Sequence, residues 1–199
     1  MKIGLTGGIA CGKSTVGAML VHLGAALVDA DQVAREVVLP GEPALGKIVA
    51  AFGSEVLHAD GSLNRGALGN IVFQNPGKRR ELESIVHPAI RERMKEQIQQ
   101  HEEQSPGIPV IADVPLLYET GQDKQYEQVI VVYIPRELQL KRLMERNPDL
   151  TKDQALGRIE AQLDIEEKRR RASWVIDNSG DIEATRLQVE ALWGRIVRC

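Results

Sequence analysis

Eight residues near the start of the chain carry the pattern of a phosphate-binding loop. They run from Gly7 to Ser14 and consist of a glycine, four free positions and then Gly-Lys-Ser. Glycines let the backbone take positive φ angles and come close to a ligand. Successive backbone N–H groups then point inward as a cup for phosphates, and the dipole of the following helix adds positive charge. We therefore predict that this loop binds the phosphates of a ligand.

Two side chains of the loop add chemistry to the backbone cup. Lys13 is expected to reach the β- and γ-phosphates, and the hydroxyl of Ser14 is expected to ligate Mg²⁺. A short apolar run at residues 2–6 precedes the loop, and apolar residues at helical spacing follow it as far as Leu23. The succession of strand, loop and helix is the context that this motif requires. The expected phosphate-binding residues are Gly8, Ala10, Cys11, Gly12, Lys13, Ser14 and Thr15.

Three aspartates are candidates for the general base that phosphoryl transfer to an alcohol needs. Asp29 and Asp31 directly follow the apolar run 25–28, and Asp113 lies near the end of the run 109–114. Asp31 is interpreted as the base, with a plain N-cap of the next helix as the alternative. Asp29 has a structural or metal-binding role as its alternative to a catalytic one. Asp113 is expected to hold Mg²⁺, and its alternative is a turn residue at the end of a strand.

Basic residues late in the chain suggest a lid over the phosphates. Arg142 and Arg146 lie four residues apart, so they share one face of a helix. The alternative is a solvated charged face that also contains Glu145. A further candidate set begins with Arg158 and includes Gln162.

Two other features of the sequence are interpreted as structural rather than functional. The run 168–171, Lys-Arg-Arg-Arg, is interpreted as a solvated helix end rather than as a phosphate or nucleic-acid contact. Cys11 stands at a helix N-terminus, a position that can lower the pKa of a thiol. We interpret it as a filler of the loop, and sensitivity to oxidation is the alternative.

The composition limits the class of protein. The chain has 199 residues, is 43% hydrophobic and 27% charged, and carries a net charge of −3. That charge gives no general attraction to nucleic acid. Its two cysteines, Cys11 and Cys199, suggest neither a disulfide framework nor a zinc site. No stretch resembles a signal peptide or a membrane span, so we expect a cytoplasmic protein without membrane partners.

The elements that must position these residues alternate between strands and helices. Apolar runs predict five strands, and the unbroken run 129–134 is typical of a strand buried on both faces. Strands that alternate with helices predict an α/β fold, a parallel sheet with helices on both faces. Ligands of such sheets bind beyond the carboxyl ends of the strands, where we expect the loop, Asp31 and Asp113 to converge. The expected strands are 2–6, 25–28, 109–114, 129–134 and 174–177.

A helical insertion is expected between the second and third strands. The sequence Asn75-Pro76-Gly77 predicts a break within it, and His87-Pro88 predicts the first turn of another helix. Farther along, Pro135 is expected to open a helix that runs to Arg146. Thr151 and Gln154 match a capping box. Asp181 is expected to cap the closing helix.

At this point the chain resembles one family closely, the dephospho-CoA kinases, and the resemblance covers nearly its whole length. Five motifs carry it, in the family's order. They are Leu5-Thr6-Gly7-Gly8-Ile9 with Gly12-Lys13-Ser14-Thr15, Asp29-Ala30-Asp31 with Ala34-Arg35, His87-Pro88, Val114-Pro115-Leu116-Leu117-Tyr118-Glu119, and Asp177-Asn178-Ser179-Gly180.

The resemblance implies the P-loop kinase fold, ATP and Mg²⁺ as cofactors, and dephospho-CoA as the substrate. It implies transfer of the γ-phosphoryl group to the ribose 3′-hydroxyl, the last step of coenzyme A synthesis. By this analogy Asp31 is the base, and Lys13 and Arg142 complete the catalytic set. Asn178 lies near the adenine of ATP. The implied contacts to the acceptor come from Asp31, Arg35, His87, Pro115 and Leu116.

The same resemblance divides a single domain, residues 1–199, by role. The core comprises residues 1–56, 105–135 and 173–199, the helical acceptor-binding insertion covers about 57–104, and the lid covers about 136–172. Cys11 departs from the family's pattern, which more often has a small residue such as Ser or Gly there. Asp113 varies more in the family than Asp31 does. A monomer is expected, with weak self-association as the alternative.

Other classes of nucleotide-binding protein match less well. A regulatory nucleotide switch would need an Asn-Lys-x-Asp motif, which the chain lacks, and the segment 177–180 comes too late to serve as its Asp-x-x-Gly motif. A transport ATPase would need a Leu-Ser-Gly-Gly-Gln signature, which is also missing. A kinase for another small metabolite is the remaining alternative.

A panel of acceptors separates these hypotheses. In a coupled assay of ADP release, we expect turnover with dephospho-CoA and none with nucleoside monophosphates or shikimate. Turnover confined to a nucleoside monophosphate would contradict the main interpretation.

Overall fold

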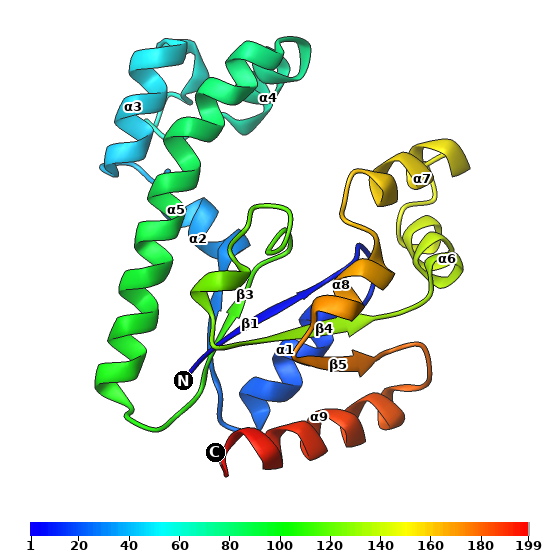
Figure 1. Ribbon diagram of the computed structural model, residues 1–199. Coiled ribbons are helices and arrows are strands. Elements are labelled where there is room, and N and C mark those ends of the chain that lie inside the picture. The colour runs from blue at the N-terminus through cyan, green and yellow to red at the C-terminus, as the bar shows by residue number, and fades with distance from the viewer. Residues whose placement is uncertain (199) are drawn as a thin grey trace. The chain divides into compact units, whose positions relative to one another are not determined.

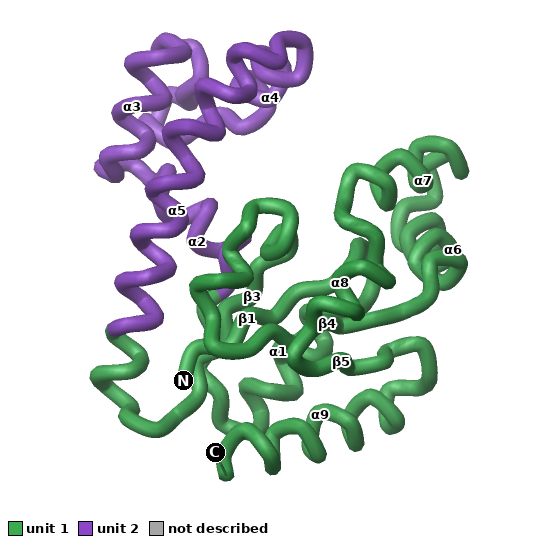
Figure 2. Tube along the Cα trace, in the orientation of Figure 1, with its two compact units in different colours: residues 1–28, 100–199 green, residues 29–99 purple. Residues whose placement is uncertain are grey.

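The computed structural model describes residues 1–198, and the chain folds into two compact units (Figure 2). The first unit contains Met1–Val28 together with the chain from Gln100 onward, and the second contains Asp29–Gln99. Each unit is described by itself.

A five-stranded parallel sheet forms the centre of the first unit (Figure 1). The order of its strands is β2-β3-β1-β4-β5. The register pairs Leu5 of β1 with Asp113 of β3 on one side and with Ile130 of β4 on the other. The expectation of a parallel α/β sheet is confirmed. The strands are β1 (Lys2–Gly7), β2 (Ala26–Asp29), β3 (Val110–Asp113), β4 (Gln128–Tyr133) and β5 (Trp174–Asp177).

Five α-helices accompany this sheet in the described part of the first unit. They are α1 (Lys13–His22), α6 (Arg136–Arg146), α7 (Lys152–Glu160), α8 (Ile165–Arg171) and α9 (Ile182–Ile196). A short 3₁₀ turn, η2, spans Asp123–Gln125. Helices α1 and α9 pack against each other, and α8 lies against β4 (Figure 1).

Burial explains why the central strands form. Residues Ile3 to Gly7 of β1 are all buried, because helices cover the sheet on both faces. The largest apolar cluster joins Ile3 and Leu5 with Leu20 of α1 and Leu192 of α9. A smaller cluster forms between α6 and α7, and Ile9 of the phosphate loop packs against it. The loop therefore stands between two apolar cores.

Three helix starts follow the expected capping chemistry. Thr151 and Gln154 form a capping box at the start of α7. Asp181 accepts the N–H of Ala184 and caps α9. Pro135 directly precedes α6. These predictions are confirmed, because the signals are local and need no tertiary contact.

The second unit is built from helices around its own apolar core. Helices α3 and α4 and the turn η1 bury Ile48, Phe52, Val56 and Leu68. An isolated antiparallel bridge joins Leu57 to Leu63 in the turn before α4. The elements are α2 (Ala30–Glu36), α3 (Pro43–Phe52), η1 (Ser54–Val56), α4 (Arg65–Gln74) and α5 (Pro76–Gln104), of which the last continues into the first unit.

One sequence prediction in this region is wrong. The break at residues 75–77 is present, but no helix starts at Pro88, because α5 continues through it from Pro76 to Gln104. A proline inside a helix lacks the N–H that would bond to the carbonyl of Ser84. Both His87 and Pro88 are exposed, so that carbonyl is open to water. Buried Met94 and Ile98 anchor the helix beyond the proline, which explains why it continues.

The division of the chain by role stays a prediction, because compactness does not assign a role to a segment. None of the helices within residues 1–198 combines the length and the apolarity that a membrane crossing requires.

We predict that Pro88→Ala stabilises the second unit. The substitution restores one helical hydrogen bond, and alanine is favoured over proline inside helices by about 3 kcal/mol. We expect urea unfolding to show a gain of about 1–3 kcal/mol. Pro76→Ala is the matched control and should change the stability little, because the first turn of a helix needs no N–H. A loss of stability in Pro88→Ala would contradict this account.

Candidate active site

The phosphate loop holds an unusual backbone between β1 and α1. Ala10 has a φ of 59° and Gly12 a φ of 83°, both in the left-handed region. The N–H of Cys11 donates to the carbonyl of Gly8 at 3.2 Å, which closes a tight turn. Positive φ at a non-glycine residue costs free energy, so the surrounding structure must hold it in place. Such a succession of turns is the geometry that aims N–H groups at an anion.

Three carbonyl groups of the loop accept hydrogen bonds from side chains. The Nζ of Lys168 donates to the carbonyl of Gly7 at 3.1 Å. The Nε2 of Gln139 donates to the carbonyl of Ile9 at 3.3 Å. The carbonyl of Cys11 accepts the Nδ2 of Asn178 at 2.8 Å. These side chains come from α8, from α6 and from the turn after β5.

The hydrogen bonds to these three carbonyls decide where the neighbouring N–H groups of the loop point. In a trans peptide, the carbonyl of one residue and the N–H of the next point in opposite directions. Every described peptide is trans. Because side chains bind the carbonyls of residues 7, 9 and 11, the N–H groups of Gly8, Ala10 and Gly12 each point away from the side chain that binds the carbonyl of the same peptide. The intervening N–H of Ile9 is occupied, because it donates to Oε1 of Gln162 at 2.8 Å.

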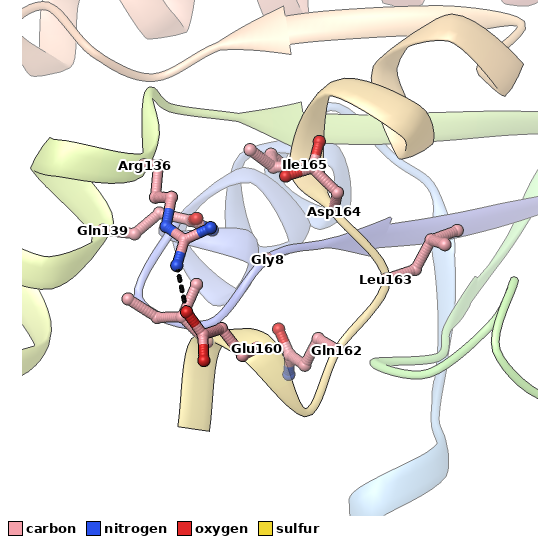
Figure 3. A pocket seen from close by; sticks show the side chains of 9 residues that line it. Gly8, Arg136, Gln139, Glu160, Gln162, Leu163, Asp164 and Ile165 are labelled. Atoms are coloured by element: carbon pink, nitrogen blue, oxygen red, sulfur yellow. Dashed lines mark hydrogen bonds and ion pairs between the residues drawn. The ribbon is translucent and has the colours of Figure 1, made fainter. Parts of the chain in front are cut away.

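A cavity of about 180 Å³ lies beside the loop at the ends of α6, α7 and α8 (Figure 3). Arg136 and Glu160 approach each other across it, with a hydrogen bond of 2.5 Å. The side chain of Gln139 reaches toward Gly8, where a β-carbon would collide with Nε2. A side chain at residue 8 would therefore displace the amide of Gln139 from its present position.

Lys13 and Asp113 form a close ion pair. Asp113 ends β3 and is only 4% exposed, so its carboxylate is held rigidly beside the ammonium group. The expected convergence of the phosphate loop and the end of β3 is therefore present in the first unit. Ser14 is exposed at the start of α1.

The two neighbouring acids after β2 have different structural roles. Asp29 is the N-cap of α2, and its Oδ1 accepts the N–H groups of Asp31 and Gln32 at 2.7 and 3.2 Å. The alternative in which Asp31 is the cap is therefore wrong. The carboxylate of Asp31 is exposed and makes no hydrogen bond with the described residues. One acid satisfies the helix start, which leaves the next one available.

The remaining expected residues divide between the two units. In the first unit, Leu116 is 42% exposed and the carbonyl of Pro115 accepts the hydroxyl of Thr6 at 3.1 Å. Arg142 on α6 is half-buried, and its guanidinium has no partner among residues 1–198. In the second unit, Arg35 and His87 are exposed.

Asn178 is buried in the turn that follows β5. Besides holding Cys11, it accepts the hydroxyl of Thr185 at 2.8 Å. Its amide therefore links the phosphate loop to α9. The expected contact with adenine stays a prediction.

The interpretation of the run 168–171 as a solvated helix end holds for three of its residues and is wrong for Lys168. Its side chain is completely buried, whereas Arg169, Arg170 and Arg171 are exposed. The signal in the sequence is its spacing, since Lys168 lies three residues after the buried Ile165 on the same helix. Gln139 was not among the expected residues. An isolated glutamine on a predicted helix gives no signal for a contact with a loop 130 positions earlier.

Cys11 does not have the lowered pKa that a helix N-terminus can produce. Burial raises the pKa of the Cys11 thiol above its ordinary value, and the backbone N–H at Lys13 and the charges of Lys13 and Lys168 oppose this only in part. The side chain is 1% exposed. The interpretation as a filler residue agrees with this burial.

The strand order and the loop define the class of protein, a P-loop kinase fold. Comparison with known proteins makes the family specific. The family model of dephospho-CoA kinases matches residues 1–184.

Curated and solved relatives agree with this match. A dephospho-CoA kinase of Symbiobacterium thermophilum is 51% identical over 192 residues, which is 96% of this chain and 79% of the relative. That of Halalkalibacterium halodurans is 51% identical over 95% of this chain and 93% of the relative. The solved dephospho-CoA kinase of Campylobacter jejuni is similar with a TM-score of 0.78 and 32% identity, and the match covers 100% of this chain and 98% of that one.

The chain belongs to the dephospho-CoA kinase family. It is a transferase of the final step of coenzyme A biosynthesis, and ATP is its phosphoryl donor.

We predict that Cys11 resists both alkylation and peroxide in the folded protein. In a Cys199→Ser variant at pH 8, iodoacetamide should modify Cys11 at least about tenfold more slowly than in urea, because the raised pKa and the burial both reduce the reactive thiolate. Intact-mass spectrometry follows the reaction. Peroxide should leave the activity unchanged. Equal alkylation rates in the native and unfolded states would contradict this assignment.

Proposed function

We propose that this enzyme transfers the γ-phosphoryl group of ATP to the ribose 3′-hydroxyl of dephospho-CoA, and that the loop at Gly7–Ser14 holds the ATP phosphates. The observation that carries this assignment is the set of side-chain hydrogen bonds to the carbonyls of the loop. Three carbonyls of the loop are each bound by a side chain, so the N–H groups of Gly8, Ala10 and Gly12 each point away from the side chain that holds their peptide. Preorganised donors of this kind stabilise charge as it moves in the transition state.

Lys13 supplies a positive charge beside the phosphate loop. Its ion pair with Asp113 keeps the ammonium group beside the loop and limits its rotamers before the nucleotide binds. Lys13 binds the β- and γ-phosphates and neutralises charge on the leaving group. Arg142, whose guanidinium has no protein partner among the described residues, adds a second cation from α6 and makes the segment about 136–172 a lid.

The residues present fit Mg²⁺. The ion takes hard oxygen ligands, keeps several waters and usually binds through one or two protein groups together with substrate phosphates. Ser14 offers an exposed hydroxyl, and Asp113 offers a rigid carboxylate at the end of β3. When bound, the ion neutralises the charge of the phosphates that these residues and the loop hold.

Asp31 accepts the proton of the acceptor hydroxyl. Asp29 supplies the cap of α2, so the exposed carboxylate of Asp31 has no structural duty in the described chain. Asp31 begins the stretch that also presents Arg35, a cation suited to the phosphates of the acceptor. His87, Pro115 and Leu116 and the insertion at about 57–104 complete the acceptor-binding part. We place the enzyme in the cytoplasm as a monomer.

We predict that Asp31→Asn removes most of the turnover and leaves ATP affinity nearly intact. General-base assistance is worth about 10²–10⁴-fold in rate, and the amide of asparagine does not accept a proton. The measurements are kcat with dephospho-CoA and the Kd of ATP. Lys13→Ala should differ by weakening both the ATP affinity and the rate.

Asp29→Asn is the matched control for Asp31→Asn. Asparagine caps helices as well as aspartate does, so this variant should keep most of its turnover. Turnover of Asp31→Asn close to that of the wild type would rule out Asp31 as the base.

A further inference from the structure

The ammonium group of Lys168 is buried and surrounded by oxygen atoms. Its side chain is 0% exposed. Its Nζ lies 3.1 Å from the carbonyl of Gly7, 3.4 Å from the carbonyl of Pro115 and 2.7 Å from Oε1 of Glu119. An ammonium group has three donors and no acceptor, so these three oxygens can satisfy it completely.

Stability alone is a poor explanation for a charge in this place. Moving an ammonium group out of water is costly, and a buried ion pair often stabilises a fold no better than apolar side chains of the same volume. What the ammonium does provide is a set of directed contacts between segments that are distant in the sequence. Gly7 lies 161 positions from Lys168, and Pro115 lies 53 positions from it.

These contacts join three segments of the first unit. Gly7 opens the phosphate loop at the end of β1. Pro115 and Glu119 belong to the loop that follows β3 and presents Leu116. Lys168 itself lies on α8, which follows the α6–α7 segment that carries Arg142.

Glu119 strengthens the junction through a second contact. Its Oε1 also accepts the N–H of Leu163 in the connection between α7 and α8, at 2.9 Å. The preceding residue, Gln162, holds the N–H of Ile9 in the phosphate loop. The pair of Lys168 and Glu119 therefore contacts both the connection that follows α7 and the phosphate loop.

We propose that Lys168 is a positioning residue for phosphoryl transfer. By holding the carbonyl of Gly7, it turns the N–H of Gly8 to the phosphate side of the loop, and through Glu119 it fixes the segment that carries Arg142. This inference rests on the proposed role of the loop as the ATP site. Lys168 acts through the backbone of Gly7 and through Glu119, so it touches neither the reacting atoms nor the substrate.

The test compares Lys168→Met with Arg170→Met. Methionine keeps the length of the chain but removes the donors and the charge. Arg170 lies on the same helix and is exposed, and within residues 1–198 its one ion pair is with Glu167, so it serves as the matched control. For each variant we would measure the melting temperature, kcat, the KM of ATP, the Kd of dephospho-CoA, and the ³¹P shift of the β-phosphate of a bound ATP analogue.

Well below its melting temperature, Lys168→Met should lose about 10- to 100-fold in kcat, because removal of one oxyanion-hole donor costs about 10²–10³-fold and a misdirected donor keeps part of its effect. The KM of ATP should rise and the β-phosphate signal should shift, and the Kd of dephospho-CoA should rise as well, because Lys168 also holds the carbonyl of Pro115 in the loop that presents Leu116. Arg170→Met should match the wild type in every measurement. A folded Lys168→Met enzyme with kcat within twofold of the wild type and an unshifted β-phosphate signal would overturn the proposal, whatever its melting temperature.

Glu119→Gln decides the question if Lys168→Met does not fold. Glutamine keeps an acceptor for Leu163 and loses only the charge, so we expect a loss of about 3- to 10-fold in kcat with the same ³¹P shift. An unchanged kcat in that variant would then overturn the proposal. Lys13→Ala separates the two assignments. If it retains full activity, the proposed ATP site fails, whereas a loss in Lys13→Ala without one in Lys168→Met or Glu119→Gln rejects only the role of Lys168.

Discussion

The orientation of three peptide planes is the constraint on which the nucleotide site depends. A loop can offer N–H groups to phosphates only if the carbonyls on its other side have partners, since buried carbonyls without hydrogen bonds are costly. In this chain the partners are side chains of Lys168, Gln139 and Asn178, contributed by elements far along the sequence. The left-handed conformation of Ala10, which costs free energy at a non-glycine residue, is tolerated because these contacts hold the loop.

Packing supports the same loop from its apolar side. Ile9 and Ala10 contact the small cluster formed by α6 and α7 around Leu143 and Ile159, while Cys11 belongs to the main cluster of the sheet. The segment proposed as a lid is thus attached to the phosphate loop through side chains of the loop itself. A shift of α6 and α7 would displace the phosphate loop, because closely packed interiors transmit strain.

The charges of the site are divided between structural and chemical tasks. Asp29 satisfies the start of α2, Asp113 holds Lys13, and Glu119 holds Lys168. Asp31 and Arg142 have no such tasks in the described chain, and we propose them for proton transfer and, together with Lys13, for charge neutralisation. Pairing some charges within the protein leaves the others available for substrates.

The sequence alone determined the sheet, the phosphate loop, most of the caps and the family. Period, glycine pattern and capping residues are local signals, and Thr151 and Asp181 act within one helical turn. Only the tertiary structure decided that Asp29 rather than Asp31 caps α2, since either acid suits that position. The continuation of α5 through Pro88 depended on the packing of Met94 and Ile98 beyond the proline. The contacts of Lys168 and Gln139 with the phosphate loop were also tertiary results, because spacing within a helix indicates which face is buried but not which distant carbonyl a side chain binds.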